Sequence, residues 1–429
     1  MHTHGHHAGG DVPDLRVGRR ARVVVVVLLA VAAAATLAGL AWLWPRTATP
    51  VLDTTPEGSS YQVVTVTDTD LLADAQTGPA LLAETAAGET VTVQVAPEYL
   101  DVVSAGDRIR VLALPQATGA APYVFVDLVR GPPMALLAAV LVVLVLAVAR
   151  LRGVGALLGL AVSVAGVLGF TVPALLVGKP ALPVALVTAA ALLYVLLYLA
   201  HGVSVRTSVA LLGTLGGLLA TGLLAAWATG ATHLTGLSGE HALDLLSLAP
   251  DASLRGILLC GMVLAGLGVL NDVTITQASA VWELRAVSPT ASRRELFAGG
   301  MRIGRDHIAS TVYTVAFAYL GAALPLVLLV AMSDRTLLDS LTSGEIAEEV
   351  VRTMVGSIGL VLAIPLTTAV ATALVPGPAV PDPTAPTSTV PDPTVPESTV
   401  PDPTVPDPTV PDPTRPASPA REGTGPALP

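Results

Sequence analysis

Long apolar stretches without a charged residue dominate this sequence. Seven of them lie near the ~20 residues that a helix needs to cross a ~30 Å hydrocarbon core, at 23–44, 132–149, 153–178, 180–200, 207–232, 308–333 and 353–375. An eighth, 256–282, has the same length but contains Asn271 and Asp272. Only 13% of the residues are charged, against ~25% in a soluble protein. The sequence therefore predicts a membrane-embedded all-α helical bundle of about eight transmembrane helices, with 23–44 as the first and seven more within 132–375.

The arginines predict how these helices are oriented. They gather at 16–22, 150–152, 206 and 285–305, which fall on one side if eight helices alternate. Short cytoplasmic loops carry an excess of Lys and Arg, so this side is expected to be cytoplasmic, with both termini inside. We interpret 23–44 as an uncleaved anchor, since it exceeds the ~7–15-residue core of a signal peptide, which is the alternative.

The segment 45–131 has a different pattern. Apolar and polar residues alternate along 61–67, 89–95 and 108–114, with turn residues at 104–107. Such alternation is typical of strands with one buried face. We expect a small extracytoplasmic β domain between helices one and two, a closed barrel of the OB or SH3-like type. Barrels of this kind host many functions, so the fold assigns none.

Both ends of the chain have a biased composition. The segment 376–429 repeats Val-Pro-Asp-Pro-Thr, and we expect a disordered cytoplasmic tail that serves as a spacer or docks a protein partner. The cytoplasmic N-terminus, 1–22, carries His2, His4, His6 and His7. These imidazoles are candidate metal ligands, although flexible tails bind metals loosely, so physiological and adventitious binding both stay open.

The helix at 256–282 carries the candidate site. With about 100° per residue, small and polar residues fall on one line, namely Gly261, Ala265, Gly268, Asp272, Thr276, Ser279 and Glu283. A lipid-facing carboxylate near the bilayer centre costs at least ~2.5–3.5 kcal/mol, so the polar half should face protein or water and the helix should be central. We take Asp272, with Asn271, Thr276, Ser279 and Glu283, as an intramembrane polar site. The alternative is a carboxyl tied to a neighbouring hydroxyl or amide that fixes helix packing.

A second group of charged residues follows this helix. Ser292 and Glu295 form a capping-box pattern, which predicts a short amphipathic cytoplasmic helix. Gly304 is expected to end that helix, and Asp306 to act as the N-cap of the next span. Arg305 serves as an anchor at the cytoplasmic face or as a partner for Glu283.

Several classes of function are excluded. The net charge of −10 and the lack of a basic patch exclude a nucleic-acid binder. The chain has no phosphate-binding loop, so ATP-driven work by this chain alone is excluded. Gly236-Leu-Ser-Gly239 matches a rhomboid-protease motif, but its serine lies in an expected outer loop. We therefore predict no enzyme and no cofactor, and the partners are the lipid bilayer and an unidentified solute or ion.

Three segments resemble the YibE/F-like membrane protein family. They are the run from Gly266 to Glu283, the run Gly304-Arg-Asp-His-Ile-Ala-Ser-Thr-Val-Tyr-Thr314, and Ala318-Tyr-Leu-Gly321 with Pro325. The resemblance extends more loosely from the outer β segment to the last span. It implies a multi-pass bacterial plasma-membrane protein that shares Asp272, Glu283, Arg305 and Asp306 with its family, which has no settled activity.

Two functional hypotheses remain. One is a gradient-driven permease for a small solute or ion, with the polar helix at its centre. The other is a sensor or assembly factor that does not transport, and that uses the outer β domain and the cytoplasmic tail.

Overall fold

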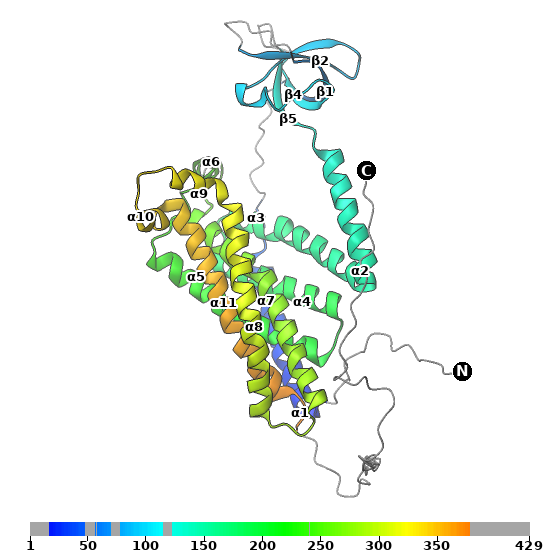
Figure 1. Cartoon of the computed structure of the whole chain (residues 1–429), viewed down its shortest axis with the longest axis vertical. Coiled ribbons are helices and arrows are strands. Elements are labelled where there is room, and N and C mark those ends of the chain that lie inside the picture. Colours follow the sequence, from blue (N-terminus) through cyan, green and yellow to red (C-terminus); the bar gives the residue numbers. More distant parts are fainter. Residues whose placement is uncertain are drawn as a thin grey trace, which may run out of the picture. The chain divides into compact units, whose positions relative to one another are not determined.

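The protein consists of long helices and one small barrel (Figure 1). The computed structural model describes residues 17–47, 56, 58–69, 78–114, 122–239 and 241–377. The expected histidine-rich start, with His2, His4, His6 and His7, and the proline-rich tail lie outside the described residues. The helices are α1 (Arg19–Leu43), α2 (Gly131–Gly166), α3 (Val172–Leu176), α4 (Ala181–His201), α5 (Val205–Ala231), α6 (Ala242–Leu248), α7 (Leu254–Val287), α8 (Arg293–Ala322), α9 (Leu324–Ala331), α10 (Leu337–Leu341) and α11 (Gly344–Leu374).

Most of the expected membrane spans are present as helices. Within the described residues, six helical stretches are long and apolar enough to cross a membrane, and the bent pair α8 and α9 would make a seventh. The six are α1, the stretch from α2 to α3, α4, α5, α7 and α11. The prediction of a multi-pass helical bundle is therefore confirmed at this coarser level.

The residues of two predicted spans form one helical stretch from α2 to α3. It is 46 residues long, because the expected helices 132–149 and 153–178 are joined. Arg150 interrupts it with a non-helical φ of 55° and ψ of −130°, and α2 bends sharply in Figure 1. Gly153 makes the bend possible, since a Cβ there would lie 2.6 Å from the carbonyl oxygen of Val145.

The expected small closed barrel is also present. Its strands are β1 (Ser60–Asp68), β2 (Ala80–Glu84), β3 (Thr90–Gln94), β4 (Arg108–Ala113) and β5 (Tyr123–Leu128). They close in the order β1-β2-β3-β5-β4, with β3 and β5 parallel and the other pairs antiparallel. Alternate residues such as Val64, Val93 and Ile109 are at most 1% exposed and form the barrel core. The alternation in the sequence thus reflects one buried face per strand.

Helix α7 occupies the centre of the helical region, as predicted. It packs against α4, α5, α8 and α11. The α5 and α11 helices also contact each other through small residues: a Cβ on Gly217 would lie 2.9 Å from the Cβ of Ala363. Small residues let helix backbones approach closely, which is how helices associate where lipid removes the hydrophobic drive between them.

The predicted break before the seventh span is wrong. The capping box at Ser292 and Glu295 is confirmed, but α8 continues through Gly304 and Asp306 to Ala322 without interruption. Asp306 is therefore not an N-cap. Gly304 lies inside the helix because the chain packs tightly there: a Cβ would lie 2.6 Å from Cγ2 of Ile364.

The last helix begins before the predicted span. Helix α11 begins at Gly344 instead of 353. Its first turns contain Glu345, Glu348, Glu349 and Arg352, charged residues that lie outside the charge-free stretch 353–375. Acidic residues near a helix N-terminus interact favourably with the helix dipole, so they extend this helix instead of ending it.

Candidate functional site

The predicted polar residues of α7 lie together on the face that no other described helix covers. Asp272, Thr276 and Glu283 are exposed, as are the small residues Gly261, Ala265 and Gly268 on the same line. Ser279 is half-buried. Asn271 is half-buried beside this face, and its Oδ1 atom is buried without a hydrogen-bond partner among the described residues.

The opposite face of α7 makes the packing contacts. Thr274 is fully buried and shares a hydrogen bond of 2.5 Å with Thr214 of α5. Gln277 is 2% exposed, and its Nε2 donates to the carbonyl of Gly300 at 2.7 Å and to the hydroxyl of Thr368 at 2.8 Å. Gln277 thus connects α7 to α8 and α11. The role of fixing helix packing through polar contacts belongs to Thr274 and Gln277.

Asp272 is left without such a contact. Within the described residues, its carboxylate makes no hydrogen bond and no ion pair, and the same holds for Glu283. The imidazole of His201, at the end of α4, lies within electrostatic reach of Asp272. Arg152 and Arg206 act on the same imidazole. The sequence did not predict that His201 belongs to this neighbourhood.

Arg305 and Asp306 do not join the α7 residues. Both are exposed on α8. The ion pairs of the described residues do not include one between Arg305 and Glu283, which the sequence had offered as an option. Arg305 therefore remains an exposed charge, as an anchor at the cytoplasmic face requires.

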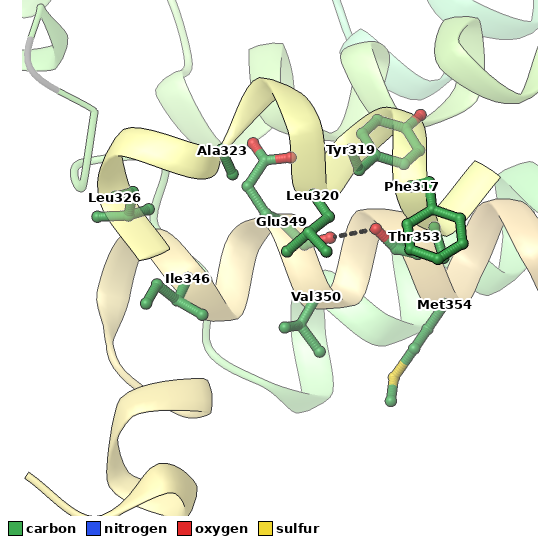
Figure 2. A pocket seen from close by; sticks show the side chains of 11 residues that line it. Phe317, Tyr319, Leu320, Ala323, Leu326, Ile346, Glu349, Val350, Thr353 and Met354 are labelled. Carbon is green, nitrogen blue, oxygen red and sulfur yellow. Dashed lines mark hydrogen bonds between the residues drawn. The ribbon is translucent and has the colours of Figure 1, made fainter. Parts of the chain in front are cut away.

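A second region that the sequence missed lies where α8 meets α9. The two helices meet at a bend of 72°, with Pro325 in the first turn of α9. The bend and the start of α11 enclose a cavity of about 350 Å³. Figure 2 shows Phe317, Leu320 and Ala323 on one side of it and residues of α11 on the other.

The polar end of this cavity is charged. Glu349 Oε1 and Arg352 Nη1 form an ion pair of 2.9 Å, and about a quarter of each side chain is exposed. The hydroxyl of Thr353 donates to the backbone carbonyl of Glu349 at 2.8 Å (Figure 2). The hydroxyl of Tyr319 lies within electrostatic reach of both members of the pair. A pair of opposite charges beside an apolar cavity is a geometry suited to a small polar or amphiphilic molecule.

Glu348, one residue away, is buried rather than part of this wall. It is 8% exposed, and its Oε1 atom has no hydrogen-bond partner among the described residues. Burial of a carboxyl oxygen without a hydrogen-bond partner costs free energy, and Glu348 near the start of α11 is such a case.

Apolar helices packed around a polar central helix define a multi-pass helical membrane protein. The YibE/F-like protein family matches residues 137–377, and the chain belongs to that family, as the resemblance predicted. The matched residues include the α7 face, the bend between α8 and α9, and α11, whereas the barrel lies before them. No curated protein and no solved structure matches the chain.

Proposed function

We propose that the protein is a gradient-driven permease for a small solute or ion, with Asp272 as the group that couples transport to the gradient. The observation that carries this proposal is the open position of Asp272, an acid without a hydrogen bond or ion pair among the described residues. An ionisable residue inside a span usually marks a substrate or ion pathway.

The depth of Asp272 follows from its neighbours. Thr274, one half-turn away, contacts Thr214, which lies in the first half of the 27-residue α5. These positions support a place for Asp272 well inside the proposed span rather than at its end. Contact between a charged Asp272 and lipid at that depth would cost at least ~2.5–3.5 kcal/mol. We therefore propose that water, rather than lipid, lies along the α7 face.

The bend between α8 and α9 supports the same function. Many secondary transporters bind their solutes at interrupted helices, because the interruption frees polar groups inside the membrane. In this chain the helix is interrupted by the 72° bend at Ala323, and a cavity with charged lining residues adjoins the bend.

We also propose eight spans and an OB-type barrel on the outside of a bacterial plasma membrane. The 46 residues from α2 to α3 are roughly twice as long as a ~30 Å core requires, so the break at Arg150 would separate two spans. The barrel closes because β1 pairs with both β2 and β4, which supports the OB type over the SH3-like type.

The orientation can be tested at Lys179, between α3 and α4. In a Cys260→Ala background, a cysteine at Lys179 should react in intact cells with a membrane-impermeant maleimide, because one span separates it from the cytoplasmic Arg150 turn and two spans separate it from the outer barrel. A cysteine at Val203, which is 86% exposed between α4 and α5, should react only after permeabilisation. Labelling of Val203 but not Lys179 in intact cells would refute the eight-span topology.

The transport proposal can be tested with Asp272→Asn, which keeps the shape of the side chain and removes its charge. We compare solute accumulation in a deletion strain complemented with the wild type, with the Asp272→Asn variant, or with Asp251→Asn as a control from the loop before α7. Asp272→Asn should lower the flux of any solute restored by the wild type at least about tenfold, with unchanged protein abundance. Full restoration by Asp272→Asn would exclude Asp272 as the coupling group.

The sensor or assembly factor remains the second candidate. The observation that favours it is the separate hydrophobic core of the barrel, which can hold a binding surface without help from the helices. A deletion strain in which no solute changes its accumulation would favour this candidate.

A further inference from the structure

The cavity at the bend between α8 and α9, which we call the bend cavity, consists of two adjoining parts, one mainly apolar and one charged. The part of about 350 Å³ is mainly apolar, and a neighbouring part of about 530 Å³ contains the charges. Both are lined by Tyr319, Ala323, Leu326 and Glu349. A molecule held here would thus contact an apolar wall at one end and charged side chains at the other.

The charged part carries an excess of negative charge. Its charged lining residues are Glu345, Glu349 and Arg352. Arg352 is paired with Glu349, whereas Glu345 is exposed and has no ion pair among the described residues. The helix dipole accounts for an acid in the first turn, such as Glu345. Glu349 lies beyond that turn and faces the cavity, so the dipole does not account for it.

The apolar part opens at an apolar surface. Phe317 is 67% exposed and Met354 is 58% exposed at its rim. Phe317 belongs to the bent pair of α8 and α9 and Met354 to α11, which are both candidate membrane spans, so we take the opening to face the bilayer. A ligand with an apolar chain can lie in this part and extend past the rim. The rings of Phe317 and Tyr319 add faces that attract cations.

We propose that this cavity binds an ammonium group carried on an apolar chain. The ammonium lies between Glu345 and Glu349, and the chain lies along Phe317, Leu320 and Met354. The proposal goes beyond the permease function, because binding here requires neither transport nor Asp272. Such a group comes either from a free alkylamine or from the headgroup of an ethanolamine lipid.

The test is equilibrium binding of radiolabelled decylamine to the full chain purified in an uncharged maltoside detergent. We expect saturable binding that unlabelled decylamine displaces at a concentration at least about tenfold lower than decanol, the size of effect that one charged hydrogen bond gives. Displacement by phosphatidylethanolamine but not by phosphatidylglycerol would assign the site to a lipid headgroup. Displacement by neither lipid would assign it to a free amine.

Variants separate the charges from the fold. Glu345→Gln keeps the ion pair of Glu349 and should weaken decylamine binding about twofold to fivefold. In the double variant Glu345→Gln/Glu349→Gln, Arg352 is the charged lining residue that remains, so the cavity is positive. This double variant should therefore bind decanoate better than decylamine. Asp334→Asn, an outer acid that does not line the cavity, and Asp272→Asn should both bind decylamine as the wild type does. Equal displacement by decanol and decylamine, or Glu345→Gln binding as well as the wild type, would overturn the proposal, whatever the flux of Asp272→Asn.

Discussion

Leucine in place of Gly359 is expected to prevent the helical region from assembling. A Cβ at Gly359 of α11 would overlap the hydroxyl of Thr221 on α5. A Cβ at Gly213 of α5 would overlap the hydroxyl of Thr367 on α11 in the same way, so the two helices interlock at both ends of their contact. Both threonines are fully buried, so neither has room to move. Overpacking of a tight core costs ~1–3 kcal/mol, and a whole leucine side chain here should exceed that range.

The matched control for this substitution is Gly356→Leu. Gly356 lies on the same helix, and a Cβ there would meet no atom within 4 Å. Fluorescence-detected size exclusion of detergent extracts should show a monodisperse peak for Gly356→Leu and a loss of that peak for Gly359→Leu. Equal peaks for the two variants would show that α5 and α11 do not pack as closely as described.

The sequence predicts only part of the contact between α5 and α11. Gly213 and Gly217 are four residues apart, and so are Gly359 and Ala363, which is the spacing of close helix contacts in membranes. The spacing is visible in the sequence, but it does not say which helices meet. That pairing depends on tertiary packing.

The α7 face was predicted in its composition but not in its surroundings. The periodicity correctly grouped Asp272, Thr276 and Glu283 on one line, because helical geometry alone fixes that grouping. The burial of the opposite face depends on Thr274 and Gln277, whose hydrogen-bond partners come from α5, α8 and α11. No pattern within one helix could predict those contacts.

The break expected at Gly304 and the expected start of the last helix differ from the structure for different reasons. Gly304 was expected to end a helix, because glycine exposes backbone to water and costs entropy. Inside a bundle the same residue instead admits a neighbouring helix, here at Ile364. The start of α11, and with it the bend cavity, was not predicted, because a charge-free stretch is the signature of a membrane span and this start contains Glu349 and Arg352.

Water along the α7 face should make cysteines there reactive. In a Cys260→Ala background, single cysteines are placed at Thr276, which is exposed, and at Thr274 and Val281, which are fully buried. Small water-soluble thiol reagents attack the thiolate, and a thiolate requires water. The cysteine at Thr276 should therefore react on the order of 100-fold faster than either buried cysteine.

The decisive comparison is between Thr276 and an exposed position that faces lipid. Leu219 of α5 is 52% exposed and apolar, so a cysteine there is open to the bilayer but not to water. The measurement that tests the permease most directly is the ratio of labelling rates at Thr276 and Leu219 in intact membranes. The proposed wet path predicts fast labelling at Thr276 and almost none at Leu219. A cysteine at Thr276 that labels as slowly as one at Leu219 would show that the α7 face is dry, and it would contradict the permease.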